Sequence, residues 1–149
     1  VMLYGNLSAM ENLDYFSRLA GFDYKQEQLT AFLSDCGLQS AAHHKLLNGF
    51  SKGMRQKVGI AIALAKNAKI ILMDEPTSGL DPKATAEFTS LVKKLAANGK
   101  SILMATHDIF NAVELGTHIG IMKQGKLVHT LRASDLSATD LQELYLQTI

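Results

Sequence analysis

The sequence is poor in the features that mark several protein classes. It contains a single cysteine, Cys36, which excludes an internal disulfide and makes a reducing compartment the simplest expectation. No apolar run approaches the roughly 20 residues that cross a bilayer. The 15 basic and 14 acidic residues leave a formal charge of +1, which gives no reason to expect a nucleic-acid-binding surface. What remains is a chain of 149 residues, 47% of them hydrophobic, which is enough for one globular core.

Two further features are missing from the sequence. There is no internal repeat or low-complexity linker, and there is no Gly-x-x-x-x-Gly-Lys-Ser/Thr phosphate loop. That loop surrounds the phosphates of a nucleotide with backbone N–H groups. A chain without it lacks the cradle that supplies most nucleotide affinity.

The first 65 or so residues have the spacing of apolar side chains that is typical of helices. Ser8 to Glu11 fits a capping box, which predicts a helix that begins there and ends at Gly21. We expect further helices over residues 24–36 and from Ser51. The side chains expected to face inward are Leu13, Phe16, Leu19, Ala20, Leu29, Phe32 and Leu33.

From Lys69 onward the pattern changes to strand, helix, strand. The helix begins at Asp81 and Pro82, a favourable pair for an N-cap and a first turn. The strand before it is apolar, as a parallel strand covered on both faces should be. The expected elements are strands over 70–73 and 101–105, a helix over 109–115, a hairpin of 118–122 with 127–131, and a final helix after Ser137 that includes Leu141, Leu144 and Leu146. The predicted division is a helical subdomain, residues 1–66, and half of an α/β core, residues 67–149.

Two adjacent carboxylates, Asp74 and Glu75, follow the first predicted strand. In an open α/β sheet, ligands bind at the C-terminal ends of the strands. A carboxylate at that position can hold Mg²⁺, and its neighbour can orient or deprotonate an attacking water. The alternative is that the two acids are only the solvated end of the strand.

The segment Phe50 to Val58 predicts a helix that begins at Ser51. Unpaired backbone N–H groups and the positive end of the helix dipole favour a phosphate there. Ser51 adds a hydroxyl donor, and Gly53 allows a ligand to approach the backbone closely. A capped, buried helix without any ligand explains the same pattern.

Together these segments resemble the ATP-binding-cassette (ABC) ATPases. Residues 70–82 are similar to the Walker B segment and D-loop, and residues 50–58 are similar to the Leu-Ser-Gly-Gly-Gln signature. Lys52 and Met54 depart from that signature in a way that resembles the exporter-type branch of the family. His107, at the end of the second strand, resembles the switch histidine. The implied fold is the α/β class, a P-loop NTPase-like ABC fold that lacks its phosphate-loop half, with a mainly parallel sheet and a C-terminal hairpin.

The resemblance implies a role for each site residue. Asp74 would hold the Mg²⁺ of bound ATP, Glu75 would act as general base or position the water, and His107 would sense the γ-phosphate. The signature residues Ser51, Lys52, Gly53 and Met54 would face a nucleotide held by a second ATPase subunit, in a homodimer or a heterodimer. Ser78, Gly79 and Asp81 would form the D-loop that crosses this dimer interface, although N-capping alone also explains Asp81.

The implied function is that of an ATPase subunit of a transporter. It would bind transmembrane permease subunits through residues 1 to about 65 and work on the inner face of the cell membrane, with no nucleic-acid partner. Because the phosphate loop, the stacking aromatic and the Q-loop are absent, we expect the sequence to be the C-terminal part of a longer protein, inactive alone. Two alternatives remain open: a non-transport ABC ATPase acting on nucleic acid or ribosomes, and a non-catalytic partner that completes another subunit's site.

Overall fold

The structure, a computed structural model, describes residues 2–148. The chain forms two compact units, one extending to Leu103 and one beginning at Met104. The predicted boundary between residues 66 and 67 separates two subdomains and differs in kind from the boundary between these units. It stays a prediction.

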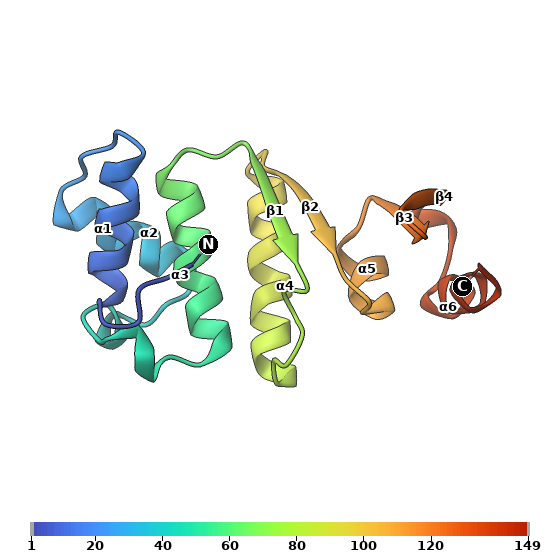
Figure 1. Ribbon diagram of the computed structural model, residues 1–149, viewed down its shortest axis with the longest axis horizontal. Coiled ribbons are helices and arrows are strands. Elements are labelled where there is room, and N and C mark those ends of the chain that lie inside the picture. The colour runs from blue at the N-terminus through green and yellow to red at the C-terminus, as the bar shows by residue number, and fades with distance from the viewer. Residues whose placement is uncertain (1, 149) are drawn as a thin grey trace. The chain divides into compact units, whose positions relative to one another are not determined.

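The first unit opens with three helices, and the starts of two of them were predicted from their caps. The Ser8 hydroxyl accepts a hydrogen bond from the Glu11 N–H at 3.2 Å, and the Glu11 carboxylate accepts one from the Ser8 N–H at 2.7 Å. This capping box is confirmed, and the helix ends shortly before Gly21, which has φ +88. The helices are α1 (Ala9–Leu19), α2 (Gln26–Asp35) and α3 (Lys52–Ala65), with the short 3-10 helices η1 (Ser40–Ala42) and η2 (Leu47–Gly49) before α3 (Figure 1).

The core of these helices contains Leu13, Leu33 and Ile62, all buried. The predictions that Leu19 and Ala20 face inward are wrong, because both residues are exposed, Leu19 to 71%. At 100° per residue Leu19 lies well around the helix from Leu13, whereas Ser17 lies near Leu13 and is buried. The Ser17 hydroxyl donates to the Leu13 carbonyl at 2.7 Å, which explains how a polar side chain occupies the inner face.

A buried asparagine fixes the chain that leads into α1. The Asn12 side chain is fully buried, and its oxygen accepts from the Tyr4 N–H at 2.8 Å. Its amide donates to the carbonyls of Tyr4 and Ser8, each at 2.9 Å. Sequence patterns did not single out this residue, because its partners are backbone groups that only the fold brings together.

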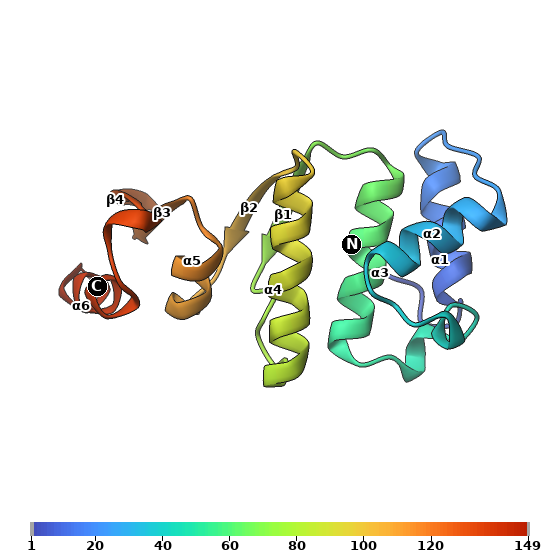
Figure 2. The same ribbon diagram turned by 180° about the vertical axis from the view of Figure 1, so that it is seen from behind.

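After α3 the chain forms β1 (Ile70–Asp74), α4 (Pro82–Ala97) and β2 (Ser101–Ala105). The two strands are parallel neighbours, and α4 lies on one face of the pair (Figures 1 and 2). Ile71 is buried, and so are the residues on the inner face of α4, which are Phe88, Leu91, Val92 and Leu95. Within the described residues β1 is covered on one face only, so its coverage on both faces in a complete sheet stays a prediction. Ile70 and Leu72 are 64% and 73% exposed, since alternate strand residues point away from α4.

The second unit contains α5 (Ile109–Leu115), β3 (His118–Lys123), β4 (Lys126–Arg132), η3 (Ala133–Asp135) and α6 (Ala138–Thr148). The predicted hairpin is confirmed: β3 and β4 are antiparallel, and Gln124 and Gly125 between them have positive φ. Its core contains Ile119, Ile121 and Leu141, whereas Leu146 in α6 is 63% exposed. No helix within residues 2–148 is long and apolar enough to cross a membrane.

Candidate nucleotide site

The N-terminus of α3 has the local structure that its sequence predicts. The Ser51 hydroxyl accepts a hydrogen bond from the Met54 N–H at 3.3 Å, so Ser51 is the N-cap. Ser51 and Lys52 are exposed, while Gly53 and Met54 are half-buried. Because capping explains the serine, the hydroxyl alone does not distinguish a ligand site from an ordinary helix start.

Gly53 lies in the first turn of α3, where glycine is an unfavourable choice. A Cβ built at this position would lie 3.5 Å from the Ala84 Cβ and 3.6 Å from the Leu80 Cδ2, which is ordinary van der Waals contact. Its φ is not in the positive region where glycine is required. Neither packing nor backbone conformation within the first unit therefore demands glycine at position 53.

The two acids sit at the carboxyl end of β1, as predicted. Asp74 is the last residue of the strand and is exposed, and the half-buried Glu75 begins the turn that leads to α4. Glu75 has φ +44, in the left-handed region that residues with a Cβ adopt only when their surroundings impose it. The backbone thus bends sharply at the second acid.

The turn formed by residues 75–81 is closed by its own hydrogen bonds. The Ser78 N–H donates to the Glu75 carbonyl at 3.3 Å, and the Leu80 N–H donates to the Thr77 carbonyl at 3.1 Å. Gly79 has φ +68, which explains the glycine there. The Asp81 carboxylate then accepts from the Ala84 N–H at 2.8 Å, so the predicted N-cap of α4 is confirmed.

Helix α3 contacts this turn directly. The Lys52 ammonium donates to the Ser78 carbonyl, and the Gln56 amide donates to the Pro76 carbonyl. The first unit thus places the signature-like residues 51–54 beside the turn after the acids. Sequence reasoning missed Gln56, whose only available signal was its spacing of four residues from Lys52, which puts both on one face of a helix.

The remaining predicted site residue, His107, belongs to the second unit and is exposed between β2 and α5. Its neighbours shape the backbone on both sides. The Thr106 hydroxyl accepts from the Asp108 N–H at 3.0 Å, and the Asp108 carboxylate accepts from the Asn111 N–H at 3.1 Å and from the Asn111 side chain at 2.8 Å.

Metal binding by protein groups alone is not supported in this structure. Among residues 2–148 no group of three or more His, Cys, Asp or Glu side chains could hold a metal ion. Mg²⁺ differs from other metals in that it commonly binds one or two carboxylates together with substrate phosphates and water. An exposed carboxylate at the end of β1, such as Asp74, fits that mode.

The chain is similar in sequence to the ATP-binding proteins of bacterial transporters. Bacitracin transport ATP-binding protein BcrA of Bacillus licheniformis is 34% identical over 145 residues, which are 97% of this chain and 47% of BcrA. Lantibiotic transport ATP-binding protein SrtF of Streptococcus pyogenes is 30% identical over 143 residues, 96% of this chain and 60% of SrtF. The chain belongs to the ABC ATPase family. It spans about half the length of these ABC relatives.

The structural comparison agrees with the sequence comparison. The ATP-binding cassette MJ0796, solved as a dimer bound to ADP and Pi, superimposes with a TM-score of 0.74 at 31% identity, covering 88% of this chain and 59% of the cassette. The predicted fold class is therefore confirmed as that of ABC cassettes. Residues 42–110 also match the family described as "AAA domain, putative AbiEii toxin, Type IV TA system", a range that includes the signature-like segment, both acids and His107.

Proposed function

We propose that this chain is part of the ATP-hydrolysing subunit of an ABC exporter that works with separate membrane permease subunits. Asp74 holds the Mg²⁺ of ATP, Glu75 orients or deprotonates the attacking water, and His107 contacts the γ-phosphate. Bound Mg²⁺ supplies charge neutralisation at the transferring phosphoryl group. Residues 51–54 face the nucleotide of a second ATPase subunit, and the D-loop residues Ser78, Gly79 and Asp81 face that subunit.

The observation that supports this proposal best is Gly53. Glycine inside a helix costs roughly 1 kcal/mol relative to alanine. Since a Cβ at Gly53 would make only ordinary contacts with Ala84 and Leu80, packing within the first unit does not explain the glycine. A phosphate at the N-terminus of α3 would approach the backbone closely at this position.

The test replaces Gly53 by alanine in the complete native gene product. Gly59, also in α3, is the matched control, because nothing lies within 4 Å of a Cβ built there. We expect Gly53→Ala and Gly59→Ala each to leave stability unchanged or raise it by about 1 kcal/mol. Only Gly53→Ala should lower ATP hydrolysis, by about tenfold or more. Equal hydrolysis by the two variants would contradict the signature role, and a native product without ATPase activity would contradict the proposed function.

The 149 residues alone are expected to bind ATP weakly and to hydrolyse it negligibly, because their sequence contains no phosphate loop. Isothermal titration of the purified chain with MgATP measures this directly. Tight, stoichiometric binding would instead favour a site complete within the chain.

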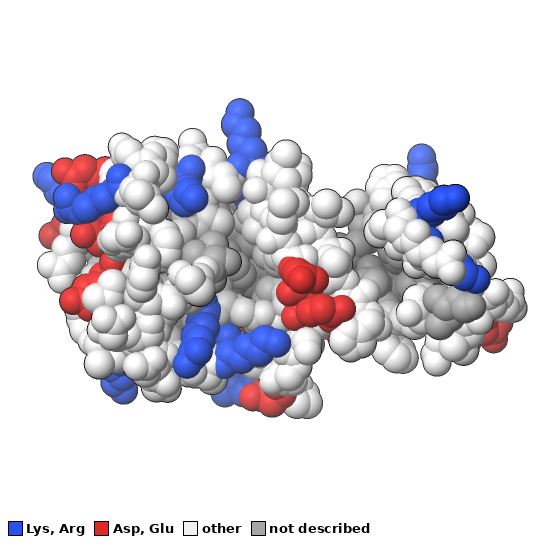
Figure 3. All heavy atoms as spheres, viewed as in Figure 1, with Lys and Arg blue, Asp and Glu red and all other residues white. Residues whose placement is uncertain are grey.

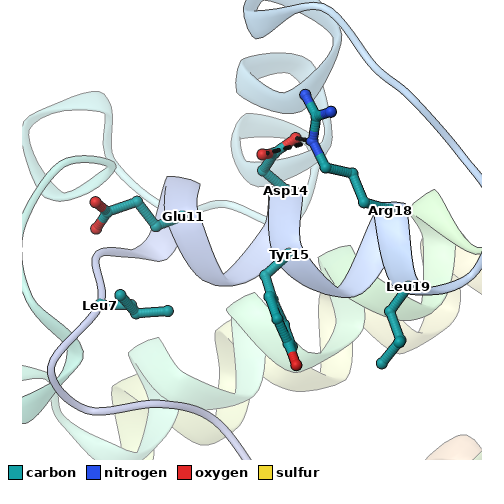
Figure 4. A pocket seen from close by; sticks show the side chains of 6 residues that line it. All are labelled: Leu7, Glu11, Asp14, Tyr15, Arg18 and Leu19. Carbon is teal, nitrogen blue, oxygen red and sulfur yellow. Dashed lines mark hydrogen bonds and ion pairs between the residues drawn. The ribbon is translucent and has the colours of Figure 1, made fainter.

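We also propose that the permease binds the helical part of the first unit through the outer face of α1. This contact would hold the ATPase subunits, which are cytoplasmic, at the membrane. A pocket there is lined by Leu7, Glu11, Asp14, Tyr15, Arg18 and Leu19 (Figure 4). Tyr15 and Leu19 point to the same side of α1, and Asp14 pairs with Arg18 at 2.9 Å on the other side (Figure 4). A pocket that is lined both by apolar side chains and by an ion pair fits a short amphipathic cytosolic segment of a membrane protein.

Leu19→Lys tests this docking surface, because Leu19 is 71% exposed and its replacement should leave the fold intact. Leu146→Lys in α6, 63% exposed, is the control. We expect Leu19→Lys, and not the control, to reduce copurification of the permease with the native gene product. Equal recovery of the permease with both variants would exclude this surface.

The alternative of a nucleic-acid or ribosome-associated ATPase finds no support in the surface charge. On the face of the first unit seen in Figure 3, basic and acidic side chains both occur over the helices. A ribosome or nucleic-acid partner recovered with the native product in place of a permease would favour that class.

A further inference from the structure

Gln56 connects the helix that contains the signature-like residues with the turn that contains the catalytic acid of the proposed function. Lys52 and Gln56 lie one helical turn apart on α3, and they donate to the carbonyls of Ser78 and Pro76 respectively. Side chains from α3 therefore contact two peptide groups of a single turn.

The Pro76 carbonyl lies one residue beyond Glu75, in the turn that follows the acid. Proline has a fixed φ and no N–H, so the freedom that remains at this residue is its ψ, which sets the direction of its carbonyl. Pro76 directly follows Glu75, whose φ of +44 persists only when neighbouring contacts impose it. A donor that holds the Pro76 carbonyl therefore restricts the peptide between Pro76 and Thr77, which is the second peptide after the acid.

We propose that Gln56 is a positioning residue for Glu75. By holding the Pro76 peptide, Gln56 keeps the Glu75 carboxylate in the orientation that attack by water requires, and it makes that orientation depend on the position of α3. This inference rests on the proposed function, because it assigns Gln56 a role in the reaction proposed for Glu75. A nucleotide that draws the N-terminus of α3 toward itself would then also act on the turn after the acid.

The competing explanation is that Gln56 only joins α3 to a neighbouring loop and adds stability. The two explanations predict different measurements. A purely structural contact would lower the midpoint of unfolding without a specific effect on the chemical step. A positioning contact would lower kcat while KM for ATP stays constant, and a second hydrogen-bond donor at the same place would rescue it.

The test uses the complete native gene product with three substitutions. Gln56→Met keeps the size and helix preference but removes the donor, whereas Gln56→Lys keeps a donor that can reach the carbonyl. Arg55→Met is the control, because Arg55 is exposed on the same helix and donates instead to the Asn48 carbonyl, at 3.4 Å.

We expect Gln56→Met to lower kcat about tenfold, with KM for ATP within about twofold of the parent protein. Hydrogen exchange at the Ser78 and Leu80 amides, which close the turn, should become faster in this variant. Gln56→Lys should recover most of kcat and of the slow exchange, and Arg55→Met should change neither.

The inference is overturned if Gln56→Met lowers kcat no more than Arg55→Met, or if exchange at Ser78 and Leu80 stays unchanged. It is also overturned if kcat and stability fall together and Gln56→Lys rescues neither. Absence of ATP hydrolysis in the parent protein would instead overturn the proposed function and this inference with it. The exchange data, which need no hydrolysis, distinguish that case from a failure of Gln56 alone.

Discussion

Lys57 on α3 and Glu87 on α4 form an ion pair in which the Nζ to Oε2 distance is 2.7 Å. The same ammonium donates to the Gly37 carbonyl at 3.1 Å, so one side chain joins α3, α4 and the end of α2. The hydrogen bond from Lys57, and then its charge, lower the pKa of the Glu87 carboxyl from its ordinary value of 4.5. This pair connects the predicted helical subdomain with the helix that packs on β1 and β2.

Glu87→Gln should lower the free energy of unfolding by less than about 1 kcal/mol at neutral pH, because Glu87 is 45% exposed and solvent screens the pair. A carboxyl with a lowered pKa in the folded state stabilises the protein above its ordinary pKa. That contribution is lost as the pH falls below about 4.5 through the lowered pKa. Urea unfolding of both proteins across this range measures the difference, with a substitution of the exposed Glu143 in α6, Glu143→Gln, as control. A difference that stays constant with pH would show that the charge of Glu87 is not involved.

Asn12→Leu should destabilise the protein by roughly 3 kcal/mol. The substitution leaves the part-buried N–H and carbonyl of Tyr4 and the buried carbonyl of Ser8 without the side chain that binds them. Asn98→Ala, at the exposed C-terminal end of α4, should cost less than about 0.5 kcal/mol. Urea midpoints of the two variants test this, and equal midpoints would mean that water replaces the Asn12 contacts.

Cys36 should react very slowly with iodoacetamide in the native protein at pH 8. Its side chain is buried, and burial, followed by the charge of Asp35, raises the pKa of the thiol to about 12. The thiolate, which is the reacting form, is therefore scarce as well as inaccessible. Mass spectrometry should find the thiol unmodified in buffer and fully alkylated in urea. Rapid native labelling would indicate that the α2 region opens frequently.

Substitutions at Asp81 separate capping from any role at a dimer interface. Asp81→Asn keeps a side-chain oxygen for the Ala84 N–H, so it should change stability by less than about 0.5 kcal/mol, whereas Asp81→Ala should cost about 1 kcal/mol. If the D-loop proposal is correct, Asp81→Asn lowers ATP hydrolysis by the native product without this loss of stability. Normal hydrolysis by Asp81→Asn would leave capping as the only role of the residue.

The starts of the main helices could be predicted because caps are local. Ser8 and Ser51 bond to N–H groups three residues ahead, and Asp81 does the same at the start of α4. The sequence around the two acids predicted that they lie at the end of a strand, and the sequence around residues 51–54 predicted that they lie at the start of a helix. Their roles stay predictions, because a role depends on a nucleotide and a second subunit.

Local sequence patterns were sufficient to predict the order of the elements, the caps and the family, since these depend on residues a few positions apart. The packing of the elements settled which faces are covered, and it left Leu19 and Leu72 exposed although both are apolar. It also decided that Gln56 meets Pro76, which lies twenty residues further along the chain. Burial and long-range hydrogen bonds depend on which elements pack against one another. A local sequence pattern does not specify which element packs against the segment that carries it.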